Sequence, residues 1–183
     1  MSEKERNKEI VEPEIGFRFH EQLEVAIPDI EKWFTPFEGS VYRTFIGDPP
    51  IERDFIPQAL REPDGKALVQ GGLSKEEYDK LSKKDRKKYV SDRTLSVNDS
   101  REHAEQTAVS NYKRVKEKWG TEYAEMHMEE DRGPYIGEVV LPKGVARISK
   151  FDKKGHGEII LNQDISWEDI EVRNIIKYQY KDE

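Results

Sequence analysis

The sequence predicts a single α+β domain in which two small, mostly antiparallel sheets pack together and helices flank them. Three observations favour this fold class. Short runs of β-branched and aromatic residues recur from residue 41 onward. A long helical middle segment separates the early strands from the late ones, which is more typical of packed antiparallel sheets than of a doubly wound parallel sheet. The length of 183 residues fits one domain with a substantial core.

Composition limits the classes of function. Only 34% of the residues are hydrophobic and 38% are charged, which is a polar balance for a globular domain. The formal net charge is −7, and an acidic chain is a poor candidate for general nucleic-acid binding. The chain has no cysteine, and this excludes thiol catalysis, disulfides and thiolate metal sites. No secretory signal and no run of roughly 18 apolar residues is visible. We therefore expect a cytoplasmic protein with no membrane segment.

The first part of the chain contains the weakest structural signals. Residues 1–14 are charged and have almost no apolar anchors, so we expect a flexible tail there and one α+β domain over 15–183. Alternating apolar residues predict a short strand over 15–19. The apolar residues that follow predict a helix from 19 to about 27 and a second helix over 28–34, with Pro28 in its first turn.

The first strong strand signal is the run of β-branched and aromatic residues over 41–46. Its alternation places Arg43 on the same face as Val41 and Phe45. An arginine on a largely apolar face is either a structural ion-pair partner or a ligand clamp. A long segment rich in proline and glycine follows over 47–72, and long loops of this kind are often functional or mobile.

Two short helices are expected next. Ser74 and Glu77 form a capping box that opens a helix to about Leu81. Residues 82–89 predict a second short helix or a continuation of the first, and they include the most basic run of the chain, Lys83–Lys88. Such a run is usually a solvated face, and the alternative is a contact surface for nucleic acid or nucleotides.

A strand over 93–97 then leads into the long helix. Asn98 or Asp99 is expected to cap this helix over 99–119, because Glu102 follows Asp99 at the spacing of a capping box. Gly120 is expected to end it. The sequence contains no phosphate-binding glycine loop, no zinc-helix motif and no nucleophile elbow. The spacing of His127 with Glu129, Glu130 and Asp131 matches no established metal motif and is more typical of a solvated loop or short helix, so no metal site is predicted.

The last third of the chain predicts four strands. We expect strands over 136–141 and 145–150 with a Pro-Lys-Gly turn between them, a third strand over 157–162 and a closing strand over 171–178.

The third of these strands is entered through Gly155-His156-Gly157-Glu158. Strand side chains alternate with period two, so His156 and Glu158 should point to the same side. They form either an acid/base or ligand-gripping pair, or the polar outer face of a half-buried strand. These residues alone leave both interpretations open.

Four short pieces occur in a suggestive order: Tyr42-Arg43, Ser96-Val97-Asn98 running into a helix, Leu141–Gly144, and Gly157–Leu161. This order resembles the ADP-ribosyltransferase fold, including its toxin-like bacterial members, over roughly residues 40–165. The resemblance implies NAD as the substrate. It also implies ADP-ribosyl transfer or NAD glycohydrolysis by a toxin, defence or effector protein, with a macromolecular acceptor in the first case.

The resemblance gives each matched residue a role and implies that they converge on one cleft. Arg43, after the aromatic Tyr42, would hold a pyrophosphate or ribose oxygen of NAD. Ser96 would brace the glutamate or the nicotinamide ribose. Glu158 would bind the ribose 2′-hydroxyl and stabilise the oxocarbenium-like centre as nicotinamide leaves. His156 could act as an acid or base, or bind a phosphate.

Two positions depart from the family pattern. Asn98 replaces the second serine of the Ser-x-Ser piece, and His156 stands where the toxin type has Gln or Glu. Because the residue two before the glutamate helps to choose the acceptor, the acceptor stays open. The alternative function is a non-catalytic binding or interaction protein of phage or mobile-element type. It would present an exposed apolar patch to a partner protein, for which the region Trp33–Phe37 is the candidate.

Overall fold

The computed structural model describes residues 27–45, 48–57, 59, 72–123, 134–161 and 167–179. The predictions of a tail over 1–14, a strand over 15–19 and a helix beginning at residue 19 fall outside these ranges. No helix in the described ranges is both long enough and apolar enough to cross a membrane.

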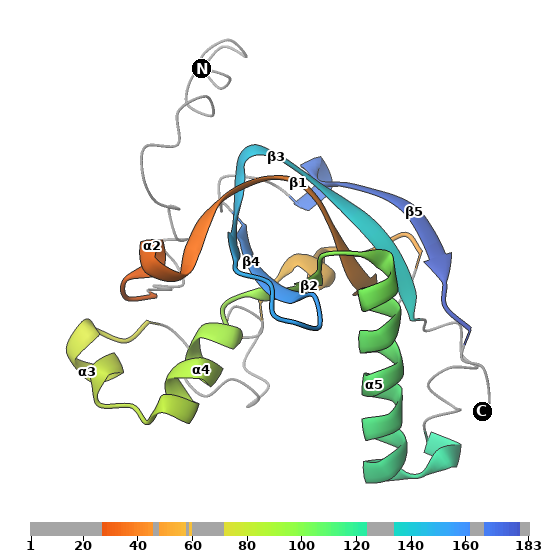
Figure 1. Ribbon diagram of the computed structural model, residues 1–183, viewed down its shortest axis with the longest axis horizontal. Helices are drawn as coiled ribbons and strands as arrows, with labels where there is room; N and C mark the ends of the chain where they lie inside the picture. Colours follow the sequence, from red (N-terminus) through yellow and green to blue (C-terminus); the bar gives the residue numbers. More distant parts are fainter. Residues whose placement is uncertain are drawn as a thin grey trace.

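The fold is α+β, with a five-stranded antiparallel sheet and a few helices (Figure 1). The strands are β1 (Phe34–Phe45), β2 (Leu95–Asn98), β3 (Tyr135–Ser149), β4 (His156–Leu161) and β5 (Glu171–Lys177). The helices are α2 (Ile30–Trp33), α3 (Lys75–Asp79), α4 (Lys83–Ser91) and α5 (Arg101–Trp119), with 3-10 turns η1 (Glu52–Phe55) and η3 (Trp167–Asp169). The predicted class, antiparallel strands with flanking helices, is confirmed at this level.

The sheet folds back on itself. Its strand order is β1-β2-β4-β3-β5, and β1 pairs with β3 as well as with β2. β1 and β3 are long and pair twice, 34–37 with 146–149 and 39–45 with 135–141, on either side of a register shift. The sequence predicted two packed sheets, and this detail is wrong. Both long strands continue through the bend, so they join the two halves into one sheet.

The prediction of two strands, 136–141 and 145–150, with a turn between them is also wrong. The structure has a single strand from Tyr135 to Ser149. The partner strand β1 lies beside β3 on both sides of residues 142–144. Gly144, with φ at +84°, therefore bends the strand and does not reverse its direction.

The predicted boundary between the helix after Pro28 and the first strong strand is wrong as well. The sequence predicted a helix over 28–34 and a strand only from 41. The helix α2 is shorter, and β1 begins at Phe34. Residues 34–37 pair with the distant end of β3, and this long-range pairing outweighs the local helical pattern.

Each face of the sheet has its own apolar cluster. The larger cluster receives side chains from β1 to β4, from η1 and from the residue that follows η3: Val41, Phe45, Phe55, Leu95, Val97, Val139, Leu141, Val145, Ala146, Ile148, Ile159 and Ile170. A smaller cluster joins Ile27 and Ile30 to Phe34 and Ile160. Ile159 and Ile160 are neighbours on β4 and belong to different clusters, as the alternation of strand side chains requires.

The short helices follow their sequence signals. Ser74 and Glu77 form the predicted capping box at the start of α3. α4 begins after Ser82, whose hydroxyl accepts a hydrogen bond from the Asp85 N–H. α4 lies on the opposite side of β2 and β4 from the end of the sheet that carries β5 (Figure 1).

The long helix α5 ends at Gly120, as predicted, but its cap differs from the prediction. Ser100 caps it, and its hydroxyl accepts a hydrogen bond from the His103 N–H at 3.2 Å. The two predicted caps have other partners. Asn98 is the last residue of β2 and donates to Thr107, and the Asp99 carboxylate bonds the His103 ring.

Candidate functional site

Register brings three of the predicted site residues to one face of the sheet. β2 and β4 are adjacent and antiparallel, with Ser96 opposite Glu158 and Asn98 opposite His156. Side chains of directly opposed residues project to the same face. Ser96, His156 and Glu158 therefore share a face, with Ser96 exposed and the other two half-buried.

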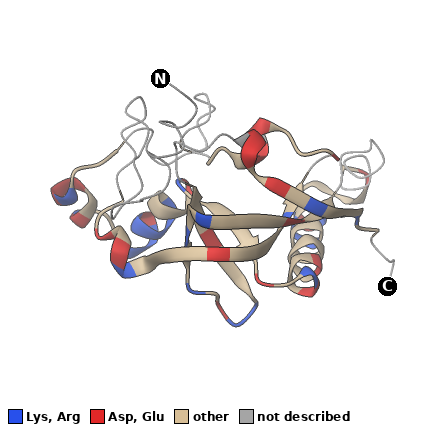
Figure 2. Ribbon diagram, turned by 90° about the horizontal axis from the view of Figure 1, so that it is seen from above, with Lys and Arg blue, Asp and Glu red and all other residues tan. Residues whose placement is uncertain are grey.

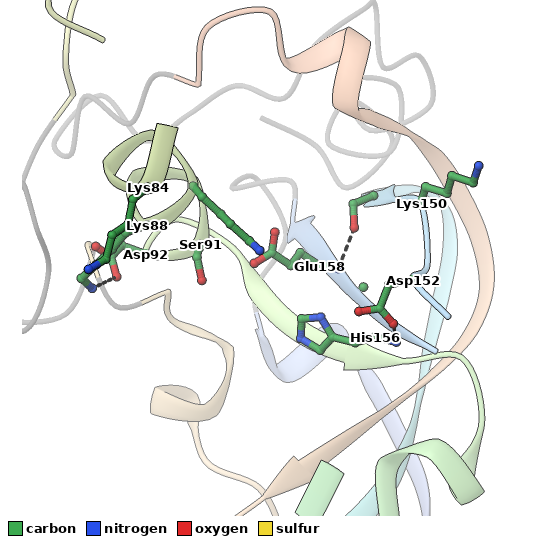
Figure 3. Close-up of a pocket in the computed structure, with 11 residues that line it drawn as sticks. Lys84, Lys88, Ser91, Asp92, Lys150, Asp152, His156 and Glu158 are labelled. Atoms are coloured by element: carbon green, nitrogen blue, oxygen red, sulfur yellow. Dashed lines mark hydrogen bonds and ion pairs between the residues drawn. The ribbon is translucent and has the colours of Figure 1, made fainter. Parts of the chain in front are cut away.

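A pocket of about 590 Å³ lies on this face, between α4 and β4 (Figure 3). One wall comes from α4 and the residue after it: Lys84, Lys87, Lys88, Ser91 and Asp92. The other wall comes from the end of β3, the following loop and β4: Ser149, Lys150, Asp152, His156, Gly157 and Glu158. The α4 residues recur at helical spacing, so one stripe of the helix faces the pocket.

The predicted basic run thus contributes to the pocket. Figure 2 shows Lys and Arg side by side along α4. Lys88 forms an ion pair with Asp92, with 2.8 Å between Nζ and Oδ1. Since Asp92 is buried, this pair fixes the C-terminal end of the helix stripe. The helical spacing of this run indicates one basic stripe, which the sequence alone favours as a solvated face, and no local pattern places that stripe over β4.

The loop before β4 is held by Asp152. Its Oδ1 accepts hydrogen bonds from the backbone N–H groups of Lys154, at 2.8 Å, and His156, at 3.0 Å. The hydrogen bond from the His156 N–H, with that from Lys154, lowers the pKa of Asp152 below its ordinary value. Asp152 therefore stays charged over the neutral range and fixes the backbone from which His156 projects.

The two glycines around His156 are needed for packing. Gly155 has φ at +67°, and a Cβ on it would overlap the His103 ring and the Asp99 carboxylate. A Cβ on Gly157 would lie 2.8 Å from Cδ1 of Phe151. Both glycines thus let the β4 backbone approach its neighbours closely. This packing sets the position of the strand that carries the candidate site.

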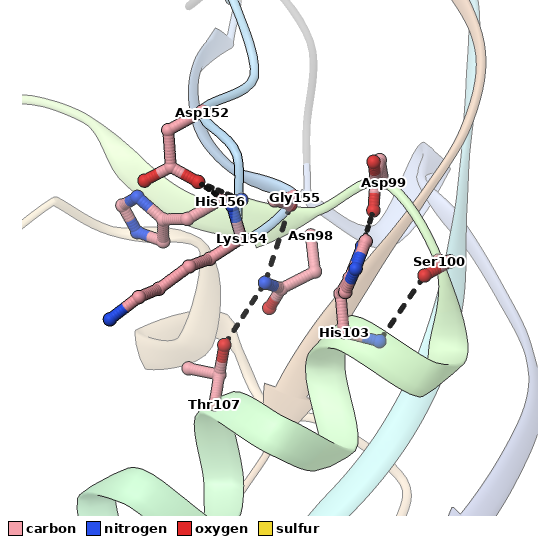
Figure 4. Close-up of polar contacts among 9 residues, drawn as sticks. All are labelled: Asn98, Asp99, Ser100, His103, Thr107, Asp152, Lys154, Gly155 and His156. Atoms are coloured by element: carbon pink, nitrogen blue, oxygen red, sulfur yellow. Dashed lines mark hydrogen bonds and ion pairs between the residues drawn. The ribbon is translucent and has the colours of Figure 1, made fainter.

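Hydrogen bonds connect this loop to the long helix (Figure 4). Asn98 Nδ2 donates to Thr107 Oγ1 at 3.0 Å and to the Gly155 carbonyl at 3.4 Å. The Asp99 N–H donates to the same carbonyl at 2.9 Å. The side-chain hydrogen bond to Asp99 raises the pKa of His103. The first turns of α5 therefore support the loop that leads to His156.

The backbone at Glu158 is also held from the neighbouring strand. Its N–H donates to the Ser149 hydroxyl at 2.9 Å. Together with the close packing of Gly157 on Phe151, this bond holds the main chain that leads into Glu158. A carboxylate on so rigid a strand is suited to act at one fixed position in the pocket.

Arg43 lies on the other face of the sheet. Because Tyr42 pairs with Asn98, alternation places Arg43 on the face of the main core. Its Nε and Nη2 donate to the Asp54 carbonyl at 3.1 and 2.8 Å, and its Nη1 donates to the Ser96 carbonyl at 2.6 Å. Arg43 therefore joins η1 to the strand that carries Ser96, and it does not line the pocket.

Tyr42 shares the face of Ser96 but packs away from the pocket. The Arg101 guanidinium lies 5.5 Å from the centre of its ring. Opposite Tyr42 on β3 is Glu138, which accepts two hydrogen bonds from Arg173, at 3.0 and 3.1 Å. The hydrogen bonds from Arg173, and further ones from Ser40 and Asn174, lower the pKa of Glu138 to about 2. These contacts join β1, β3, β5 and α5, so the surroundings of Tyr42 are structural.

The structure thus brings His156 and Glu158 into one pocket, sets Ser96 opposite Glu158, and leaves Arg43 and Tyr42 outside the pocket lining. The pocket residues that sequence reasoning missed come mainly from α4 and the β3–β4 loop. Among the described residues, no group of three or more His, Asp or Glu side chains could hold a metal ion.

Comparison of the chain with models of protein families, with curated proteins and with solved structures finds no match.

Proposed function

We propose that the chain binds NAD in the pocket between α4 and β4 and cleaves its nicotinamide glycosidic bond, passing the ADP-ribosyl group to an acceptor or to water. The observation that supports this proposal is that His156 and Glu158 line one pocket of about 590 Å³, with Ser96 opposite Glu158 on the neighbouring strand. This volume lies within the range of about 300–1,000 Å³ typical of small-molecule sites.

The proposed step needs one anionic and one proton-accepting group. The bond between ribose C1′ and the nicotinamide nitrogen breaks, and nicotinamide leaves with the electron pair. The Glu158 carboxylate stabilises the positive charge that develops on the ribose. An oxygen of the acceptor or of water bonds to C1′, and His156 accepts its proton. Ser96 hydrogen-bonds Glu158 or the ribose from the neighbouring strand.

Arg43 has a different part in this proposal from the one that the family resemblance implies. Its guanidinium already donates to two main-chain carbonyls, those of Asp54 and Ser96. We therefore assign it the support of the Ser96 strand and not the binding of NAD. Tyr42, packed against Arg101, has a similar structural part.

The test is NAD consumption by the purified full chain, with and without cell lysate as a source of acceptor. Glu158→Gln should lower turnover by about 100-fold or more, because it removes the charge while keeping the shape. His156→Ala should also lower turnover and change its pH dependence. Glu171→Gln, an exposed strand carboxylate away from the pocket, is the matched control.

Unchanged melting temperatures would show that these substitutions act on the chemistry and not on the fold. No turnover by the wild-type chain under either condition would refute the proposal. Full activity in Glu158→Gln would refute the assigned role of that residue.

A non-catalytic interaction protein is the second candidate, and exposed tryptophans favour it. Trp33 is 63% exposed on α2, and Trp119 is 59% exposed at the end of α5. The Trp119 ring packs against that of Tyr123, which is also exposed, with 5.8 Å between the ring centroids and a tilt of 37°. If this candidate holds, Trp33→Ser or Trp119→Ser should abolish capture of one defined partner that the wild-type chain retains, with no change in folding.

A further inference from the structure

The pocket differs in charge from the chain as a whole. The chain has a formal net charge of −7, yet the pocket is lined by four lysines, Lys84, Lys87, Lys88 and Lys150. Three carboxylates, Asp92, Asp152 and Glu158, also line it. The net charge that a ligand would meet in the pocket depends on which of these side chains already form ion pairs with one another.

One of the three carboxylates is neutralised by an ion pair: Asp92 is buried and pairs with Lys88 at 2.8 Å. Asp152 accepts hydrogen bonds from two backbone N–H groups of its own loop, which fix its position and leave it charged. Among the described residues, Lys84, Lys87 and Lys150 make no ion pair, so three ammonium groups face the two charged carboxylates Asp152 and Glu158. The pocket therefore keeps a net positive charge, and its α4 wall, which carries Lys84 and Lys87, is suited to a ligand with more than one negative charge.

The spacing of the lysines on α4 narrows the chemistry of that ligand. Lys84 and Lys87 are three residues apart on one helix face, which puts their Cβ atoms about 5–6 Å apart. Ammonium groups act as mobile point charges, and lysine is a common phosphate binder. Two neighbouring ammoniums fit two linked phosphates, each with a negative charge, better than a single carboxylate.

We infer that Lys84 and Lys87 of α4 form a diphosphate-binding site in this pocket. Where it concerns NAD, this inference rests on the proposed function. It assigns the diphosphate to the α4 lysines, whereas the family resemblance would assign it to Arg43. Glu158 on the facing strand would then lie on the ribose side of the ligand.

Calorimetric titration of the full chain tests the site with two probes, inorganic pyrophosphate and ADP-ribose. The Lys84→Gln/Lys87→Gln variant should bind both probes about 10-fold more weakly, because two charge-assisted contacts are lost. Lys83→Gln, on the same helix but outside the pocket lining, is the matched control and should bind within about twofold of wild type. The difference should shrink as salt is raised.

The inference is overturned if wild type binds neither probe, if the double variant binds like wild type, or if Lys83→Gln weakens binding as much. Binding of a single-stranded oligonucleotide without binding of pyrophosphate would also overturn it, in favour of a nucleic-acid contact. Melting curves of each variant show whether a loss of binding comes from a loss of fold.

These outcomes are independent of NAD turnover. Lysine-dependent binding of pyrophosphate without any NAD consumption supports the diphosphate site and refutes only the proposed reaction. NAD consumption that is insensitive to the double substitution supports the reaction and overturns the diphosphate site.

Discussion

Alanine substitutions at three glycines separate the cost of backbone strain from the cost of overpacking. Gly120 has φ at +92° and open space where a Cβ would lie. Gly157 has no positive φ, but its Cβ would lie 2.8 Å from Phe151. Gly155 combines both conditions, with φ at +67° and overlap with His103 and Asp99. The three positions therefore form an internal series.

The expected losses in the free energy of unfolding follow from these contacts. Gly120→Ala should cost about 1–3 kcal/mol from the backbone alone, because φ at +92° and ψ at 164° lie in a region that essentially only glycine adopts. Gly157→Ala should cost about 1–3 kcal/mol, from overpacking against an aromatic ring. Gly155→Ala should cost about 2–5 kcal/mol, since both terms act at one residue.

Urea unfolding and thermal melting of the full chain measure these losses. For a domain of this size, 1 kcal/mol corresponds to about 2–4 °C in the melting temperature. Replacing Phe151 by Leu should recover part of the loss in Gly157→Ala, because the smaller side chain makes room for the methyl group. If Gly155→Ala is no more destabilising than Gly120→Ala, or if the Phe151 replacement recovers nothing, the packing account of β4 is wrong.

Three further substitutions test separate contacts. Ser100→Ala should lower the free energy of unfolding by about 1 kcal/mol, because the N-cap hydrogen bond of α5 is removed. Urea unfolding measures this change, and a change near zero would contradict the stabilising role of the cap. Arg43→Lys should lower the free energy of unfolding by about 1–3 kcal/mol, because a lysine cannot bridge the Asp54 carbonyl and β2 together. An unchanged melting temperature would contradict this structural role of Arg43. His103 has a raised pKa because of Asp99, so its stabilising contribution is complete below its ordinary value of 6.5 and is lost as pH rises through the raised value. The difference in melting temperature between wild type and His103→Gln should therefore be larger at about pH 5.5 than at about pH 9, and a difference independent of pH would contradict the pairing.

The features that sequence reasoning predicted depend on residues close together in the chain. The capping box of Ser74 and Glu77 spans a single helical turn, so its chemistry is visible without any tertiary information. The shared direction of His156 and Glu158 follows in the same way from the alternation of one strand.

The features that sequence reasoning did not predict depend on contacts between residues that lie far apart in the chain. Residues 142–144 have the composition of a turn, and only the presence of β1 on both sides shows that β3 continues through them. Arg43 was placed on the correct face, but the choice between structural partner and ligand clamp required the positions of Asp54 and Ser96. The pocket required α4 to be placed over β4, which no local pattern specifies.

The pairing of β1 with β3 has a consequence for how the chain acquires its structure during synthesis. Phe34 pairs with Ser149 and Phe45 with Tyr135, so β1 leaves the ribosome long before its main partner exists. Until then β1 has an unpaired edge, which is a surface on which other chains can add as strands. Closing so large a loop is slow, because its entropic cost precedes the contacts that repay it. Helices α3, α4 and α5 close their backbone hydrogen bonds within their own segments, so unlike β1 they leave no long unpaired edge in that interval. The sheet, and with it the pocket, can form only after β3 and β4 have been made.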